Sequence, residues 1–315
     1  MTNATDEKPN HKVWNIWRWV AMGAGIAAIA SLPAALAWVS LHPTRRLHNK
    51  TPRSFLGIDF ERVRLRARDG VPISAWYVPA PPSETPRGVI ILCHGYHGNR
   101  SKMLPYLEFL HRVGFAAVLF DWRAHGWSGG KRATFGYTEP EDLFAALDWV
   151  SEHSDLAHLP LALYGESMGA SVALLVAAEE PERVKAVVAD SPYARFDHAV
   201  EGRITMILGP VVAPLVIPNA RRIGELVLGV SCEEIAPLHA MERIFPRPVL
   251  LIHGQEDRLI APENSRWIAA ASPGNVTLWE VPKAGHVQSV LVGGEEYAER
   301  VVSFLTAALR VAPPA

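Results

Sequence analysis

Short apolar runs alternate along this chain with longer segments in which apolar residues recur every three or four positions. The apolar runs have the length and composition of buried strands and lie at residues 88–94, 116–122, 161–164, 184–189, 249–253 and 276–281. The segments with helical spacing lie at residues 103–113, 140–153, 170–178, 262–271 and 295–310. Strands without polar alternation, separated by helices, predict a mostly parallel sheet covered by helices on both faces.

A hairpin is predicted ahead of this alternating part. Residues 60–67 and 73–78 have strand-like composition and flank Asp69-Gly70, a dipeptide typical of tight turns. The hairpin and the alternating segments together predict one α/β domain at residues 59–315, a length normal for a single large domain of this class.

One stretch, residues 197–246, interrupts the alternation because it contains no strand pattern. Residues 204–220 within it carry no charge and contain Pro210, Pro214 and Pro218. Proline lacks the N–H that a helix interior needs, so this spacing predicts that no single helix runs through the stretch. We interpret residues 197–246 as a helical insertion that forms a cap over the domain.

The N-terminal part differs from the rest because residues 19–41 contain no charged side chain. A helix of these 23 residues would be about 34 Å long at about 1.5 Å per residue, enough to cross a bilayer. Tryptophans, which favour the membrane–water boundary, lie near both ends, at positions 14, 17, 19 and 38. We therefore expect a tail at 1–18, a single transmembrane anchor at 19–41 and a linker at 42–58.

Two features of this segment bear on processing and orientation. Ala35-Leu36-Ala37 has the small-x-small form of a signal-peptidase site, which would make the segment a cleavable signal peptide. The apolar run is longer than the usual signal core, and this favours an uncleaved anchor.

Basic residues lie at positions 8, 12 and 18 before the span and at 45, 46, 50 and 53 after it. By the positive-inside rule, the larger group after the span favours a cytoplasmic catalytic domain.

Composition excludes several classes of function. The chain carries 31 basic and 32 acidic side chains, whereas a nucleic-acid-binding protein would show a basic surplus. Cys93 and Cys232 are too few for a disulfide scaffold, and we expect both thiols to be free. The sequence contains no H-E-x-x-H or C-x-x-C metal spacing and no dinucleotide or phosphate-loop fingerprint. We therefore expect no metal and no cofactor.

A G-x-S-x-G motif, Gly165-Glu166-Ser167-Met168-Gly169, lies between a predicted strand and a predicted helix. This strand–turn–helix setting is that of a nucleophile elbow, which raises a serine hydroxyl above the end of the sheet. Gly165 and Gly169 allow the neighbouring backbone to pass close to the turn. Ser167 is the predicted nucleophile, and the N–H of Met168 is a predicted donor to the oxyanion that forms during acyl transfer.

A serine hydroxyl is a weak nucleophile at neutral pH and needs a neighbouring base. Among thirteen histidines, His286 is the best placed, because it follows a predicted strand and precedes the last helix. Asp257 lies on the loop after another predicted strand, so nucleophile, acid and base follow in the order Ser167, Asp257, His286. Two rivals for the role of the acid stay open: Glu256 beside Asp257, and Asp190 at the end of the preceding strand.

The second predicted oxyanion donor lies on a different loop. The run His94-Gly95-Tyr96-His97-Gly98-Asn99 follows directly after a predicted buried strand. The Tyr96 N–H is the expected donor, since a loop at this strand end can reach the serine. His94 and Gly95 are expected to shape the site around it.

Five segments, HGYHGN, DWRAHGWSGG, GESMG, HGQED and AGH, follow one another in an order and at a spacing that resemble the α/β-hydrolase superfamily. The second is similar to a segment of the serine aminopeptidase-like and monoacylglycerol-lipase-like branch, although Ala124 stands where that branch usually has glycine. The resemblance covers residues 60–310. It implies an eight-stranded, mostly parallel sheet with a cap over the site, and the activity of a serine hydrolase.

The predicted activity is hydrolysis of a carboxylic ester, or of a related acyl bond, through an acyl-enzyme on Ser167. A serine aminopeptidase or an acyl-thioesterase with the same triad stays open, as does an inactive, membrane-tethered binding module. The apolar residues 204–217 could line an acyl pocket or touch the membrane surface. We therefore expect a small-molecule or lipid acyl substrate, a bilayer contact through residues 19–41 and no nucleic-acid partner.

Overall fold

A sheet of eight strands forms the centre of the computed structural model, which describes residues 11–47, 49–82 and 85–309. Along residues 11–30, side chains are described only for positions 17–20 and 22. The strands are β1 (Glu61–Arg66), β2 (Pro72–Val78), β3 (Val89–Cys93), β4 (Ala116–Phe120), β5 (Leu161–Glu166), β6 (Val184–Asp190), β7 (Val249–Gly254) and β8 (Val276–Val281).

The strand order in the sheet is β1-β2-β4-β3-β5-β6-β7-β8. β2 pairs antiparallel with both of its neighbours, and all pairs from β4 to β8 are parallel. The register of β3 with β5 aligns Cys93 with Gly165, so these strands end at one edge of the sheet. The loops that follow β3, β5 and β7 therefore meet there, which is where ligands bind in sheets of this kind.

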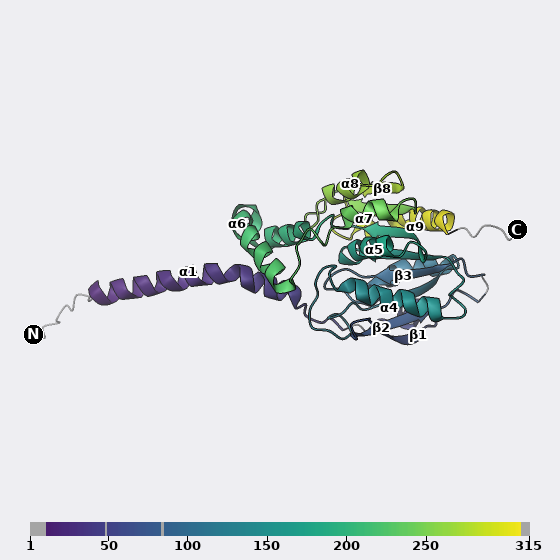
Figure 1. Ribbon diagram of the computed structural model, residues 1–315, viewed down its shortest axis with the longest axis horizontal. Coiled ribbons are helices and arrows are strands. Elements are labelled where there is room, and N and C mark those ends of the chain that lie inside the picture. The colour runs from purple at the N-terminus through teal and green to yellow at the C-terminus, as the bar shows by residue number, and fades with distance from the viewer. Residues whose placement is uncertain (1–10, 48, 83–84, 310–315) are drawn as a thin grey trace, which may run out of the picture.

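Helices cover both faces of the sheet (Figure 1). They are α1 (His11–Leu41), α2 (Pro52–Leu56), the 3₁₀ helix η1 (Arg100–Met103), α3 (Leu104–Arg112), α4 (Glu139–Glu152), α5 (Met168–Glu179), α6 (Phe196–Leu228), α7 (Pro237–Ile244), α8 (Glu263–Ala270) and α9 (Ser289–Ala308). This architecture confirms the predicted sheet with helices on both faces. α9 begins at Ser289, ahead of the predicted start at 295, because the chain bends at Gly294 without ending the helix.

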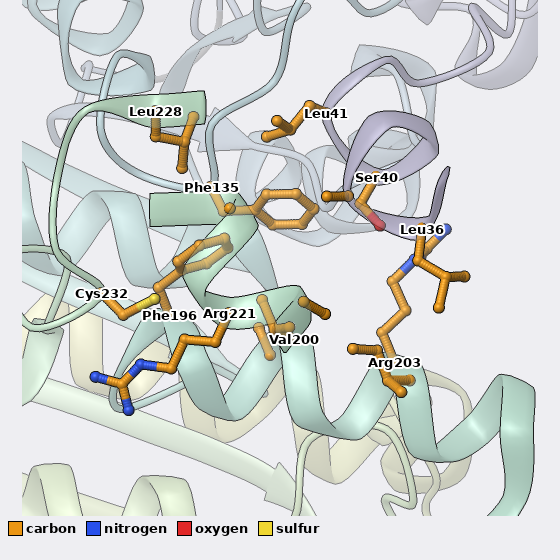
Figure 2. A pocket seen from close by; sticks show the side chains of 15 residues that line it. Leu36, Ser40, Leu41, Phe135, Phe196, Val200, Arg203, Arg221, Leu228 and Cys232 are labelled. Atoms are coloured by element: carbon orange, nitrogen blue, oxygen red, sulfur yellow. The ribbon is translucent and has the colours of Figure 1, made fainter. Parts of the chain in front are cut away.

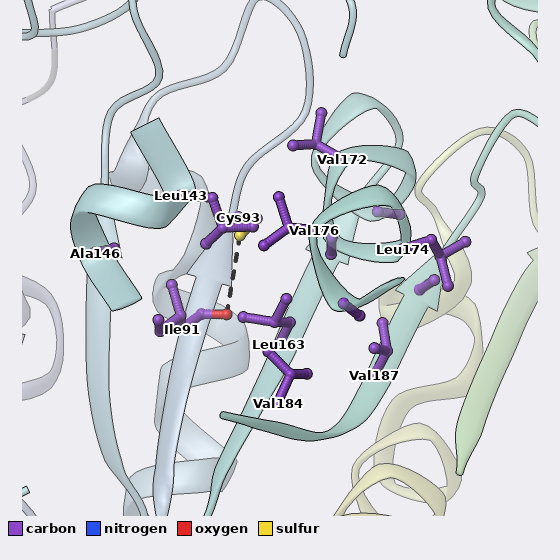
Figure 3. Close-up of a cluster of buried hydrophobic side chains, with 14 of the residues drawn as sticks. Ile91, Cys93, Leu143, Ala146, Leu163, Val172, Leu174, Val176, Val184 and Val187 are labelled. Carbon is purple, nitrogen blue, oxygen red and sulfur yellow. Dashed lines mark hydrogen bonds between the residues drawn. The ribbon is translucent and has the colours of Figure 1, made fainter. Parts of the chain in front are cut away.

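Two separate clusters of buried side chains fix the helices to the sheet. α4, α5, α7 and α8 pack on one face, and α3 and α9 pack on the other. Figure 3 shows part of the first cluster, where Val172 and Val176 of α5 lie near Leu163 of β5. The Cys93 thiol lies in this cluster, 4.0 Å from the Ile91 carbonyl oxygen, and burial raises its pKa, so it is an unreactive core group.

The insertion is built mainly from α6, which bends at Gly209 (φ 76°, ψ 163°) directly before Pro210. The helix is thus interrupted within the stretch, as predicted, and Pro214 and Pro218 both lie inside its second part. These two prolines are exposed and four residues apart, on the face that looks away from the neighbouring helix. Packing of the opposite face compensates for the backbone hydrogen bonds that the prolines remove.

The C-terminal part of α1 is the neighbour on which α6 packs. Leu32 and Leu36 of α1 contact a small buried cluster on α6 that includes Ala213 and Val216. Figure 1 shows α1 extending away from the sheet, with this C-terminal end beside α6. The first helix is thus joined to the insertion by apolar contacts rather than by sequence proximity.

Among residues with described side chains, one helix is long and apolar enough to cross a bilayer: α6, with a mean hydropathy of 1.6 and 17% of its most apolar window buried. The predicted anchor at 19–41 lies in α1, but the side chains at 21 and 23–30 lie outside the described residues. The α1 backbone is helical over the whole predicted span.

Candidate active site

Ser167 occupies the sharp turn between β5 and α5. Its backbone has φ 51° and ψ −119°, a left-handed conformation that is strained for a residue with a side chain. Its N–H donates to the Asp190 carbonyl oxygen at 2.8 Å, which holds the turn. A Cβ on Gly165 would lie 2.4 Å from the Gly169 carbonyl group, and one on Gly169 would lie 2.2 Å from the Cys93 oxygen. Both glycines are therefore required for the turn to form.

His286 and Asp257 lie beside this turn on two further loops. His286 follows β8, and its Nε2 lies 2.8 Å from Ser167 Oγ. Its Nδ1 lies 2.7 Å from Asp257 Oδ2, on the loop that follows β7. The structure thus brings together the three side chains named from the sequence, in a chain of hydrogen bonds that can carry a proton away from the serine.

Asp257 is held as a carboxylate. The N–H groups of Leu259 and Ile260 each donate to its Oδ1 at 2.9 Å, and His253 Nε2 lies 3.3 Å from Oδ2. Burial opposes the charged form, but hydrogen bonds with His253 and His286 outweigh it and lower the Asp257 pKa to about 2. An ionised acid beside Nδ1 fixes the imidazole tautomer in which Nε2 can accept the serine proton.

The two rival acids lie elsewhere. Glu256 is exposed to solvent. Asp190 is buried, and it accepts hydrogen bonds from the Ser191 and Tyr297 hydroxyls, each at 2.8 Å. Burial raises the Asp190 pKa. The geometry therefore pairs His286 with Asp257, and Asp190 supports the turn through its carbonyl and side-chain contacts.

Two residues in the lining of the cleft carry backbone N–H groups that donate to no described residue. Gly95 N–H donates to Glu166 Oε1 at 3.2 Å, and His97 N–H donates to His125 Nε2 at 3.3 Å. Between them, the Tyr96 N–H has no acceptor among the described residues, and the same holds for Met168 N–H at the start of α5. Unpaired donors at such positions can stabilise a developing oxyanion.

Glu166 supports the loop that carries Gly95 and Tyr96, a role that was not predicted from the sequence. Besides binding Gly95, it accepts a hydrogen bond from the Tyr106 hydroxyl at 3.2 Å. Burial raises its pKa to about 7. Its position next to Ser167 in the motif was the available signal. Its hydrogen bond with Tyr106 of α3 could not be predicted, because only folding brings these two residues together.

His94 also supports the loop rather than facing the cleft. It is fully buried, and its Nε2 accepts a hydrogen bond from Trp122 N–H at 3.2 Å. The Trp122 indole N–H donates in turn to the His94 carbonyl oxygen at 2.7 Å. The residues that line the cleft itself include Gly95, Tyr96 and Ser167.

The cleft above Ser167 has a volume of about 500 Å³, within the usual range for small-molecule sites. A narrower apolar pocket lies beside it, between the C-terminal end of α1 and α6 (Figure 2). Its walls include Leu36 and Leu41 of α1 and Phe196 and Val200 of α6. The two spaces adjoin, because both are lined by Phe135, Ala199 and Arg203.

The C-terminal end of α1 and the segment after it are tied to the loops of the site. The Tyr96 hydroxyl donates to the Ser40 carbonyl oxygen at 2.5 Å. The Arg45 guanidinium donates to backbone oxygens of the loop 126–130, including Gly130 at 2.6 Å. Asn99 Nδ2 donates to the Arg46 oxygen at 3.1 Å. Arg46, which was predicted only as part of a linker, therefore lies in the lining of the cleft.

No group of three or more His, Cys, Asp or Glu side chains within residues 11–47, 49–82 and 85–309 is arranged to hold a metal ion. The polar groups at Ser167 are instead those of a nucleophile, a base, an acid and two backbone donors. Such an arrangement can transfer an acyl group through a covalent intermediate.

Comparison with known proteins places this chain in a family. Residues 84–227 match the family model described as serine aminopeptidase, S33. The chain is 30% identical to the Bacillus subtilis protein YqkD over 237 residues, which cover 75% of this chain and 76% of YqkD. It is also 30% identical to the Mycobacterium tuberculosis protein Rv2307c over 244 residues, or 78% of each chain.

A solved structure is similar over most of the molecule. The Pyrococcus furiosus esterase Pf2001 superposes with a TM-score of 0.68 at 30% sequence identity, covering 85% of this chain and all of the esterase. The likeness includes the eight-stranded sheet and confirms the predicted fold. The chain therefore belongs to the serine aminopeptidase S33 family of the α/β-hydrolase superfamily, and it is an α/β hydrolase related to esterases.

Proposed function

We propose that this protein is a membrane-anchored carboxylesterase that forms an acyl-enzyme on Ser167. The observation that carries the proposal is the hydrogen-bonded chain from Ser167 Oγ through His286 to Asp257, with distances of 2.8 Å and 2.7 Å. Such a chain activates a serine hydroxyl that would otherwise be a poor nucleophile.

The reaction proceeds in two halves. His286 Nε2 removes the Ser167 proton as the oxygen attacks the acyl carbonyl carbon, and Asp257 stabilises the imidazolium. The N–H groups of Tyr96 and Met168 bind the oxyanion of the tetrahedral intermediate. His286 then protonates the departing alcohol, and a water molecule activated by the same imidazole releases the acid from the serine.

The pocket between α1 and α6 supports an ester with an apolar acyl part. Its lining is mostly aliphatic and aromatic, with Arg203 and Arg221 as its charged members, and it adjoins the cleft at Phe135. An acyl chain placed there would remove apolar surface from water, which is favourable by about 0.8 kcal/mol per methylene group. The structurally similar Pf2001 is an esterase, and this supports ester over amide hydrolysis.

We also propose that α1 anchors the protein in a membrane, with the catalytic domain on the cytoplasmic side. The uncharged residues 19–41 and the basic residues that follow them support this arrangement. Trp17, Trp19 and Trp38 of α1 are 67%, 69% and 61% exposed, as expected of side chains that lie at a bilayer boundary. Val211 and Leu215 of α6 are also largely exposed and could touch the same surface.

The proposed reaction is tested with two substrate series assayed side by side on the full chain in detergent. One series consists of p-nitrophenyl esters of increasing acyl length, and the other of aminoacyl and peptidyl p-nitroanilides. The proposal predicts ester hydrolysis that depends on Ser167 and much slower anilide hydrolysis. Faster cleavage of the anilides would contradict it and favour an aminopeptidase, and the absence of both activities in a folded sample would favour a binding module.

A further inference from the structure

Three basic side chains from three separate segments line the cleft that holds Ser167. Arg46 follows α1, Lys102 belongs to η1, and Arg203 lies in the first part of α6. Of the described residues that line this cleft, one is acidic, Glu166, and its oxygens already bind Gly95 N–H and the Tyr106 hydroxyl. The open part of the cleft therefore carries an excess of positive charge.

No ion pair among the described residues neutralises this positive charge. None of the ion pairs between described residues includes Arg46, Lys102 or Arg203. Arg46 and Lys102 are exposed, and Arg203 is half-buried. Basic groups that converge on a cleft without acidic partners raise the local concentration of anions.

Neutral groups hold Arg203 at the wall of the cleft. Its guanidinium carbon lies 5.2 Å from the centre of the Tyr96 ring, and its Nη2 lies 2.8 Å from His97 Nε2. Burial and the charges of Arg203 and Arg46 lower the His97 pKa to about 4, so this imidazole stays neutral and can accept the hydrogen bond. Neutral partners thus hold the Arg203 guanidinium beside the loop that carries a proposed oxyanion donor.

The arrangement separates an apolar space from a charged one. Arg203 lines both the cleft and the pocket between α1 and α6, whereas Arg46 and Lys102 line the cleft alone. An acyl chain in the apolar pocket leaves the charged side of the cleft for the other half of the ester. The part of the substrate that departs as an alcohol would therefore lie among the three basic side chains.

We propose that Arg46, Lys102 and Arg203 form a subsite for an anionic group on the leaving alcohol, so that the preferred substrates are acyl esters carrying a carboxylate or phosphate there. The inference rests on the proposed esterase function and names the substrate class of that site. Arginine and lysine both bind such oxyanions, arginine in a bidentate manner. The anionic group can belong to a soluble ester or to the headgroup of a lipid.

The test compares two nitrophenyl butanoates that share the acyl chain and differ only by a carboxylate on the nitrophenyl ring. The full-length protein in detergent should have a higher kcat/KM for the anionic ester. The double variant R46Q/K102Q should lower the ratio of the two kcat/KM values by about tenfold, since two partly exposed charge contacts are lost. Raising the ionic strength should reduce the ratio in the wild type more than in the double variant.

Arg112→Gln is the matched control. Arg112 is an exposed basic residue at the C-terminal end of α3, outside the lining of the cleft. It should leave the ratio of the two kcat/KM values as in the wild type. A ratio that neither R46Q/K102Q nor salt changes would overturn the inference while leaving the esterase function intact. Loss of hydrolysis of both esters in the wild type would overturn the esterase function, and the subsite with it.

Binding to vesicles separates a substrate subsite from a contact between the basic residues and anionic lipid headgroups. The protein is mixed with vesicles of phosphatidylcholine, with or without phosphatidylglycerol, and both esters are assayed again. The subsite predicts that the ratio of kcat/KM values stays high without anionic lipid. If R46Q/K102Q weakened binding to anionic vesicles but left the ratio unchanged, the basic residues would serve membrane contact, and the inference would be wrong.

Discussion

At the scale of single residues, two buried aspartates lie within reach of the Ser167 turn, and their surroundings give them different states. Asp257 accepts from two backbone N–H groups and from His286, which keeps it ionised. Asp190 binds two hydroxyl groups and has a pKa raised by burial. The hydrogen-bond partners, rather than burial alone, decide which carboxyl group can stabilise an imidazolium.

The substitution Asp257→Asn tests this distinction. It should reduce kcat by roughly 10³–10⁴, because an amide beside Nδ1 no longer stabilises the correct tautomer or the imidazolium. Asp190→Asn keeps the size of the side chain and acts only through the turn, so its loss of kcat should be smaller by more than about tenfold. Steady-state kinetics with a p-nitrophenyl ester measures both, and a larger loss in Asp190→Asn would move the acid to β6.

Glu166 gives a second prediction at this scale, on stability. A carboxyl group with a pKa of about 7 in the folded protein is protonated there at pH values where the unfolded chain has ionised it. The free energy of unfolding should therefore fall as the pH rises from about 4.5 to about 7, by roughly 3 kcal/mol.

Glu166→Gln cannot ionise and should show little of this decrease, although its side-chain oxygen can still accept from Gly95 N–H. Urea denaturation of both proteins at several pH values provides the measurement. A parallel pH dependence in wild type and variant would show that Glu166 is ionised in the folded state.

At the scale of elements, α1 and α6 together form the wall of the apolar pocket. Leu36 and Leu41 come from α1, and Phe196 and Val200 come from α6 (Figure 2). A pocket between two helices can be filled from either side without touching the loops that carry Ser167 and His286. Acyl-chain selection should therefore change independently of the reaction itself.

Val200→Trp should fill this pocket and shift the optimum of a p-nitrophenyl ester series towards acyl chains shorter by about two to four carbons. Val211→Trp is the matched control, since Val211 is 84% exposed on the same helix. It should leave the chain-length profile as in the wild type. An unchanged profile in Val200→Trp would place the acyl chain elsewhere in the cleft.

The sheet, its helices and the loops of the site were predictable because each depends on local pattern. Ser167, Asp257 and His286 could be named from strand ends, since parallel strands bring their following loops to one edge. The contact of Arg45 with the loop 126–130 could not be predicted in this way, because it joins polar segments about 80 positions apart. The continuation of α6 through Pro214 was likewise decided by packing on α1, which outweighs a local preference.

At the scale of the whole molecule, the C-terminal end of α1 and the segment after it link the proposed anchor to the catalytic site. Ser40 binds Tyr96, and Arg45 binds the loop 126–130. A protein anchored by α1 would therefore hold its cleft at a fixed distance from the bilayer. Substrates that partition into the membrane could reach the pocket between α1 and α6 from that side.

The anchor makes a prediction about localisation. The full chain should stay with the membrane pellet after carbonate extraction, because the proposed anchor at residues 19–41 is uncharged and long enough to span the apolar core of the bilayer. A fluorescent protein fused to the C-terminus should fluoresce, and alkaline phosphatase at the same position should be inactive, if the domain is cytoplasmic. Release of the chain by carbonate would contradict the anchor. An active phosphatase would contradict the proposed orientation.

Covalent labelling tests the central claim, that Ser167 is the nucleophile, most directly. A fluorophosphonate probe reacts with a serine that a neighbouring base activates, and mass spectrometry of the digested protein locates the modified residue. We predict one modified peptide containing Ser167 in the wild type, little labelling in His286→Ala and none in Ser167→Ala. Equal labelling of the wild type and Ser167→Ala would contradict it.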